Sequence, residues 1–150
     1  MKFRINQIID HVKSHSSDPK LVASSISIGL FFGILLPMGT QSLVVVPIAL
    51  YLRVNVYIAM SATLITNPLT VAPLYYVSIL IGKYITSFNF NREEIQGIIN
   101  SPNYENLLSL GREILISLVL GNLCIAILIS ITSYFLIPKI LSKLKRKRSD

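Results

Sequence analysis

Three long stretches of the chain contain no charged residue: residues 21–52, 54–82 and 114–138. Each is longer than the ~20 residues that cross a bilayer as a helix. Only Arg53 separates the first two stretches, and each of these is interrupted near its middle by helix breakers. The pattern predicts an all-α integral membrane protein, with broken or re-entrant membrane helices in residues 19–88 and a C-terminal transmembrane helix over residues 112–138.

The two interruptions are Pro37-Met38-Gly39 and Asn67-Pro68. Proline and glycine disfavour a continuing helix, so helix breaks are predicted at Pro37, Gly39 and Pro68. Irregular backbone at membrane depth is tolerated only inside protein or beside a water-filled cavity. Paired breaks in corresponding positions are typical of transporter sites, because the freed helix ends carry partial charges.

The first membrane helix is expected to begin at Pro19, with Ser17 or Asp18 as its cap. Small residues recur at every fourth position of this helix and predict a close packing surface for another helix. They are Ser25, Gly29 and Gly33. The later pieces are expected to reach Leu52, then to span residues 54–65 and 70–87.

The polar segments complete the predicted organisation. Residues 1–18 alternate apolar and polar positions at helical spacing and predict an interfacial amphipathic helix. Residues 89–111 are read as a soluble loop with short helices, and residues 139–150 as a basic cytoplasmic tail closed off from the last span by Pro138. Both termini are basic, which predicts a multi-pass protein of the bacterial inner membrane with both termini in the cytoplasm. The region before the loop then crosses either once, together with a re-entrant hairpin, or three times.

The formal net charge of +7 is concentrated in the polar end segments. This distribution indicates topology and contact with anionic lipids, and argues against nucleic-acid binding. The expected lipid-contacting residues are Lys143, Lys145, Arg146, Lys147 and Arg148. Cys124 is the single cysteine, so the chain has no internal disulfide and no cysteine metal cluster.

No catalytic arrangement is visible, and neither an enzymatic activity, a metal nor a cofactor is expected. His11 and His15 have no metal-ligand partners at suitable spacing. The candidate site is instead a polar pocket between the breaks, formed by Gln41, Arg53, Asn55, Asn67 and Thr70. Two simpler interpretations stay open. Arg53 can mark the membrane surface by extending its side chain to it, and Asn67 and Thr70 can serve only to satisfy backbone carbonyls that Pro68 releases.

Several motifs in order resemble the bacterial membrane family called domain of unknown function 2062. They are the Gly29-x-x-x-Gly33 helix, the Pro37-x-Gly39-x-Gln41 turn, the Arg53-x-Asn55 junction and the Asn67-Pro68-x-Thr70 break. The resemblance covers residues 19–83 and departs from the family pattern at Leu64-Ile65-Thr66, where aromatic residues are common. It implies a bacterial inner-membrane protein and supplies no activity. At the level of fold alone, the broken hairpins are similar to the DedA-like proteins linked to lipid translocation.

Two functional hypotheses follow. In the first, the polar pocket transports or translocates an anionic solute or lipid. In the second, the chain is an accessory or scaffold membrane protein that binds an unknown protein partner through its loop or tail. A third, a membrane enzyme acting on lipid headgroups, lacks a nucleophile, base or metal. A homo-oligomer is expected, because so few helices shield polar groups poorly from lipid.

Overall fold

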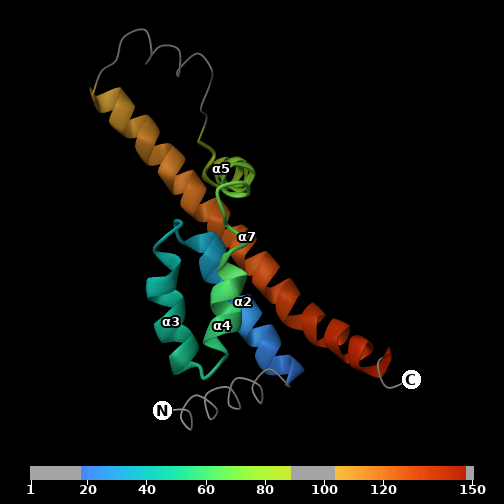
Figure 1. The fold of residues 1–150 in the computed structure, drawn as a ribbon. Coiled ribbons are helices and arrows are strands. Elements are labelled where there is room, and N and C mark those ends of the chain that lie inside the picture. The colour runs from blue at the N-terminus through green and yellow to red at the C-terminus, as the bar shows by residue number, and fades with distance from the viewer. Residues whose placement is uncertain (1–17, 89–103, 148–150) are drawn as a thin grey trace, which may run out of the picture. The chain divides into compact units, whose positions relative to one another are not determined.

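The computed structural model describes residues 18–88 and 104–147. Within these residues every regular element is an α-helix, which confirms the predicted all-α class. The helices are α2 (Pro19–Leu35), α3 (Gln41–Tyr51), α4 (Val56–Thr63), α5 (Val71–Thr86) and α7 (Tyr104–Lys147) (Figure 1). The amphipathic helix expected in residues 1–18 and most of the loop expected in residues 89–111 lie outside the described residues.

The chain forms two compact units. Of the described residues, one unit comprises 18–67 and 126–147, and the other 68–88 and 104–125. The long helix α7 contributes to both.

Helix α2 begins where the sequence predicts. The Asp18 carboxylate accepts a hydrogen bond from the backbone N–H of Lys20 at 2.9 Å, and Pro19 occupies the first turn, where a missing N–H removes no helical bond. Asp18 is thus the residue that caps the helix.

Along α2 the small-residue stripe lies against α4. A Cβ atom added to Gly29 would overlap the Ala59 carbonyl, and one added to Gly33 would come within 2.9 Å of the Thr63 Cα. The third member, Ser25, accepts a hydrogen bond from the backbone N–H of Asn55 at 2.9 Å. The two helix backbones therefore approach more closely than any larger side chain would permit.

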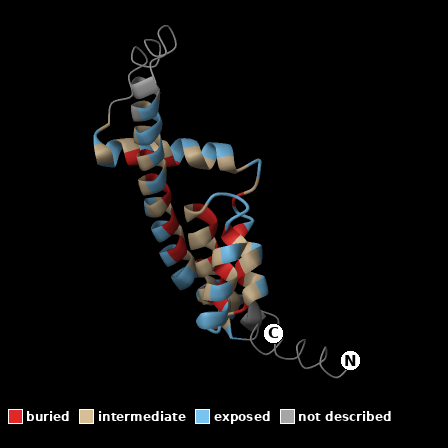
Figure 2. Ribbon diagram, turned by 90° about the vertical axis from the view of Figure 1, so that its left-hand side faces the viewer, coloured by how far each residue is buried: buried red, intermediate tan, exposed pale blue. Residues whose placement is uncertain are grey.

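A small apolar core holds α3 against α4. Val45, Ala49 and Ala59 are fully buried, and Phe32 and Met60 are among the partly buried residues that pack on them. Buried positions lie where the helices of this unit face one another, while the outer faces are intermediate or exposed (Figure 2). Many of those outer residues are large and apolar, with Leu43 76% and Leu50 63% exposed.

The turn between α3 and α4 is a Schellman motif. The N–H of Arg53 donates to the Leu50 carbonyl at 3.2 Å, and the N–H of Val54 donates to the Ala49 carbonyl at 3.0 Å. Arg53 has a φ of 54°, the left-handed conformation that this motif requires and that glycine most often supplies. Asn55 then caps α4, its Oδ1 accepting from the N–H of Ile58 at 3.1 Å.

Because a side chain at positive φ is strained, Arg53→Gly is expected to leave the fold intact and to stabilise it by up to about 1 kcal/mol. The measurement is the unfolding midpoint in detergent, with Arg53→Ala as the control that removes the charge but keeps the strain. Clear destabilisation by Arg53→Gly alone would show that the turn does not have this geometry.

In the second unit, α5 and the first part of α7 pack through two Ser-x-x-x-Gly pairs. A Cβ atom on Gly82 of α5 would overlap the Ser117 carbonyl, and one on Gly121 of α7 would overlap the Ser78 carbonyl. The Ser78 hydroxyl lies 2.6 Å from Asn122 Oδ1 and donates to it. The same device therefore closes a helix pair in each unit: small residues facing a neighbouring backbone, with a serine hydrogen bond beside them.

Only α7 among the described helices is long and apolar enough to cross a membrane, over Leu110–Lys143. Helices α2, α3, α4 and α5 have 17, 11, 8 and 16 residues, each below the ~20 of a full span. The first two uncharged stretches are thus broken, and the third is one continuous helix.

The predicted end of the last helix at Pro138 is wrong, because α7 continues to Lys147, inside the predicted tail. At its other end α7 begins at Tyr104, within the segment predicted to contain short helices. A proline inside a helix removes one backbone hydrogen bond, here to the carbonyl of Tyr134, four residues earlier. The residues that follow it, mainly lysine, leucine and isoleucine, continue the helix readily.

Candidate functional site

The first break is a tight turn that leaves one helix carbonyl without its usual donor. The N–H of Thr40 donates to the Pro37 carbonyl at 3.2 Å, and Gly39 has a φ of +94°, which only glycine adopts readily. In a continuing helix the Gly33 carbonyl would accept from residue 37. Because that residue is proline, the N–H does not exist.

Two side chains supply the missing donors. Gln41 Nε2 donates to the Gly33 carbonyl at 2.8 Å and to Thr66 Oγ1 at 2.7 Å, and it also lies 3.3 Å from the Leu36 carbonyl. Thr66 Oγ1 lies 2.7 Å from the same Gly33 oxygen, to which it can donate. Both side chains are buried, with exposed fractions of 7% and 5%. The first break is thus joined to the residues just before the second by one buried hydrogen-bond network.

The second break repeats the arrangement on a smaller scale. Helix α4 tightens at its end, where Ile65 and Thr66 donate to the carbonyls three residues earlier, at 3.3 and 3.2 Å. Pro68 cannot donate to the Leu64 carbonyl, and Asn67 Nδ2 does so instead at 3.3 Å. In both breaks an amide side chain takes the place of the proline's missing N–H.

Other members of the predicted pocket lie elsewhere. Asn55 is buried as the cap of α4, and Arg53 is exposed in the Schellman turn. That turn follows the last residue of α3, whereas Gln41 is the first, and the 11 residues between these ends span roughly 16 Å. Arg53 and Asn55 therefore do not share a pocket with Gln41. The interpretation of Arg53 as a surface residue and that of Asn67 as a partner for released carbonyls fit this arrangement better.

Thr70 has a different place, at the start of α5. It precedes the helix with φ −92° and ψ −20°, and Thr40 precedes α3 with φ −91° and ψ −15°. Neither threonine side chain caps its helix, and the Thr40 hydroxyl instead donates back to the Pro37 carbonyl at 2.9 Å. Both breaks thus end in the same local conformation, followed by a helix start without a side-chain cap.

Two buried polar residues were missed by sequence reasoning. Thr66 is the centre of the break network, and its position directly before Asn67-Pro68 was the available signal. Asn122 is 4% exposed and bonded to Ser78, and it is the only amide residue in the uncharged stretch 114–138. A lone amide in such a stretch indicates a buried partner.

The basic residues and possible metal ligands add no further site. Lys143 is exposed near the end of α7, which also includes Lys145, Arg146 and Lys147, whereas Arg148 lies outside the described residues. In the described part of the chain, no group of three His, Cys, Asp or Glu side chains could hold a metal ion.

Over residues 18–88 and 104–147, the fold and breaks define an all-helical protein with one long apolar helix and two proline breaks bridged by amide side chains. A family model described as "Uncharacterized protein conserved in bacteria (DUF2062)" matches residues 3–150, so the chain belongs to this family. The match extends the resemblance seen in residues 19–83 over nearly the whole chain. Neither the curated proteins nor the solved structures contain a match.

Proposed function

We propose that the chain is a multi-pass integral protein of the bacterial cytoplasmic membrane in which α2 and α3 form a re-entrant hairpin. The proposal is supported by helix length, because neither helix reaches the ~20 residues of a span. In this arrangement the hairpin enters the membrane near Lys20, turns at the first break and leaves the membrane at Arg53. The hydrogen bond from the Asn55 N–H to Ser25 brings the Arg53 turn to the same end of the unit as the start of α2.

The exterior of these helices supports membrane insertion. Large apolar side chains are exposed on α3, on α4 and at the second break, and a soluble surface rarely carries so many. Examples are Leu43, Leu50, Tyr57, Leu64 and Leu69. With α2 and α3 re-entrant, α4 and α5 together cross the membrane once as a broken helix, and α7 crosses it in the opposite direction. Both basic termini then lie in the cytoplasm. A homo-oligomer accords with this small number of crossings.

We further propose that the protein translocates an anionic solute or lipid past the two breaks. The observation that carries the proposal is the pair of matching helix starts, after Thr40 and after Thr70, each without a side-chain cap in an uncharged stretch. Backbone N–H groups at a helix start carry partial positive charge and attract anions. The attraction would come from backbone rather than from Gln41 or Asn55, whose side chains are engaged in structural bonds.

The alternative is an accessory protein without transport activity. It is favoured by the internal satisfaction of the break network, in which Gln41 and Thr66 bond the Gly33 carbonyl. In that case the breaks are rigid joints, and a protein partner binds elsewhere. Neither proposal assigns an enzymatic reaction to the chain.

Water access to the breaks separates the two proposals. In a Cys124→Ser background, Thr40→Cys and Leu69→Cys replace exposed residues of the two breaks without touching the Gln41 network. Leu43→Cys, on the exposed apolar face of α3, is the matched control. Translocation predicts that a membrane-impermeant thiol reagent labels positions 40 and 69 in intact cells or vesicles and leaves position 43 unlabelled.

Labelling at all three positions would contradict membrane insertion of this region. Protection of positions 40 and 69 from the impermeant reagent, together with reaction with a lipid-soluble maleimide, would place the breaks in lipid and favour the accessory role.

A further inference from the structure

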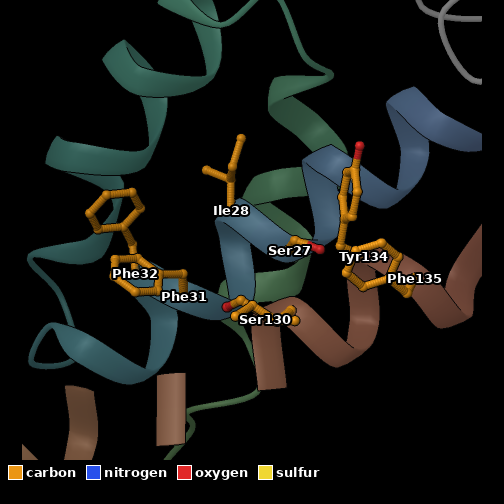
Figure 3. A pocket seen from close by; sticks show the side chains of 8 residues that line it. Ser27, Ile28, Phe31, Phe32, Ser130, Tyr134 and Phe135 are labelled. Atoms are coloured by element: carbon orange, nitrogen blue, oxygen red, sulfur yellow. The ribbon is translucent and has the colours of Figure 1, made fainter. Parts of the chain in front are cut away.

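A groove on the first unit contains two buried hydroxyl groups that have no hydrogen-bond partner. The groove has a volume of about 300 Å³ and lies between α2 and the part of α7 that belongs to the same unit. Its lining residues are Ser27, Ile28, Phe31, Phe32, Ser130, Ile131, Tyr134 and Phe135 (Figure 3). Apart from the two serines and the Tyr134 hydroxyl, the lining is apolar.

Ser27 and Ser130 are each 9% exposed, and neither Oγ atom has a partner. The other two serines of α2 bond the carbonyl one turn earlier, Ser24 that of Lys20 at 3.0 Å and Ser25 that of Leu21 at 2.7 Å. A buried hydroxyl without a partner costs about 1–3 kcal/mol. Two of them lining one groove indicate that an acceptor from outside the chain completes their hydrogen bonding, after at most a rotation about χ1.

The rest of the groove indicates the character of that acceptor. Phe31 and Phe32 stand at one end, with ring centroids 5.0 Å apart and planes at 89°. Tyr134 and Phe135 stand at the other end, with centroids 5.3 Å apart and planes at 84°. Such walls favour a slender apolar chain, and on a membrane-facing surface the chains available are lipid acyl chains.

Charge indicates the orientation of the ligand. Ser27 lies beside the Tyr134 end of the groove in Figure 3, so α2 and α7 run antiparallel. The start of α2 and the end of α7 are therefore at the same end, where the described residues include exposed Lys20, Lys139 and Lys143 and one acid, Asp18. Lys20 lies in the first turn of α2, about 10 Å along the helix axis from Ser27, a distance that a lysine side chain and a lipid headgroup can bridge together.

We propose that this groove binds a bilayer phospholipid with an anionic headgroup, whose acyl chain lies between the two aromatic pairs and whose ester carbonyl accepts hydrogen bonds from Ser27 and Ser130. The inference rests on the proposed membrane location and gives the proposed translocation a lipid as its ligand. The phosphate lies toward the lysine-bearing end of the groove.

The test uses the full chain in nanodiscs that contain a trace of photoactivatable phosphatidylglycerol with a diazirine on its acyl chain. Cross-linked peptides are identified by mass spectrometry, and unlabelled phosphatidylglycerol competes in two forms, one ester-linked and one ether-linked. The ether form lacks the carbonyl oxygens. The expected result is labelling concentrated on peptides containing Phe31 or Tyr134, with the ester form competing about tenfold better than the ether form.

The double substitution Ser27→Ala and Ser130→Ala is expected to remove the difference between ester and ether competitors. Because both hydroxyls lack partners, it should not lower the stability of the fold. Ser24→Ala on the same helix is the matched control, since its hydroxyl bonds Lys20 away from the groove, and it should keep the tenfold difference.

Labelling spread evenly over exposed residues such as Leu43 and Leu128, with equal competition by both lipids, would overturn the lipid site. So would occupation of the groove by a second copy, seen as disulfide-linked dimers of Ile131→Cys in a Cys124→Ser background. Carbonate extraction of the same membranes tests insertion separately. Extracted protein would defeat the membrane proposal itself, whereas inserted protein without groove labelling would defeat only the lipid site.

Discussion

Replacing Gly29 with alanine is expected to destabilise the α2–α4 pair by about 3 kcal/mol, although alanine is the better helix former. The added methyl group would overlap the Ala59 carbonyl and lie 2.7 Å from the Ala62 Cβ. Neither atom belongs to a flexible side chain, so the methyl group can be accommodated only if the two helices move apart. Separation would also strain the hydrogen bond between Ser25 and the Asn55 N–H.

The matched control is Gly111→Ala. Gly111 is exposed in α7, and an added Cβ meets nothing within 4 Å. The same substitution there is expected to stabilise the helix by about 0.5–1 kcal/mol. Free energies of unfolding in mixed detergent micelles measure both effects. A Gly29→Ala protein as stable as the Gly111→Ala protein would show that α2 and α4 do not pack as closely as described.

The second large effect is expected at the break network. Gln41→Leu keeps the approximate volume of the side chain and removes the amide that donates to the Gly33 carbonyl and to Thr66. The loss is expected to be about 2 kcal/mol, because the Gly33 carbonyl stays buried beside a proline that cannot donate to it. Thr66→Val, which removes the second donor, is expected to cost a similar amount.

A double-mutant cycle distinguishes a network from two independent bonds. The Gln41→Leu, Thr66→Val double variant is expected to deviate from additivity by about 1 kcal/mol, since both side chains bond the same carbonyl and each other. Thr40→Val is the matched control, because its hydroxyl bonds the Pro37 carbonyl at an exposed position, and it should change stability by less than about 0.5 kcal/mol. Strict additivity of the first pair would contradict the network.

Even if these bonds are confirmed, they leave the two functional proposals open. A network whose hydrogen bonds are all satisfied can be a rigid joint in an accessory protein or a rigid part of the lining of a translocation path. Water access at Thr40 and Leu69 distinguishes them. The dependence of lipid binding on the ester carbonyl at Ser27 and Ser130 tests whether the ligand is a phospholipid. Because the groove residues take no part in the break network, the two experiments can fail independently.

The sequence by itself determined the helical class, the position of the breaks and the small-residue face of α2. These features depend on local properties: the lack of charge, the missing N–H of Pro37 and Pro68, the backbone freedom of Gly39, and a four-residue spacing that repeats along one helix face. The same local reasoning was wrong about Pro138, because one lost hydrogen bond does not end a helix whose later residues favour it.

Only the tertiary structure decided which polar residues meet. Sequence spacing grouped Gln41, Arg53 and Asn55 as neighbours in an apolar region, yet α3 separates Gln41 from the other two along its whole length. Thr66 is the partner of Gln41, although 25 positions separate them. The reason is that α4 packs along α2, so that the end of α4 lies at the first break. The groove of Ser27 and Ser130 likewise exists only because residues about 100 positions apart pack together. Local residue patterns do not predict long-range packing of this kind.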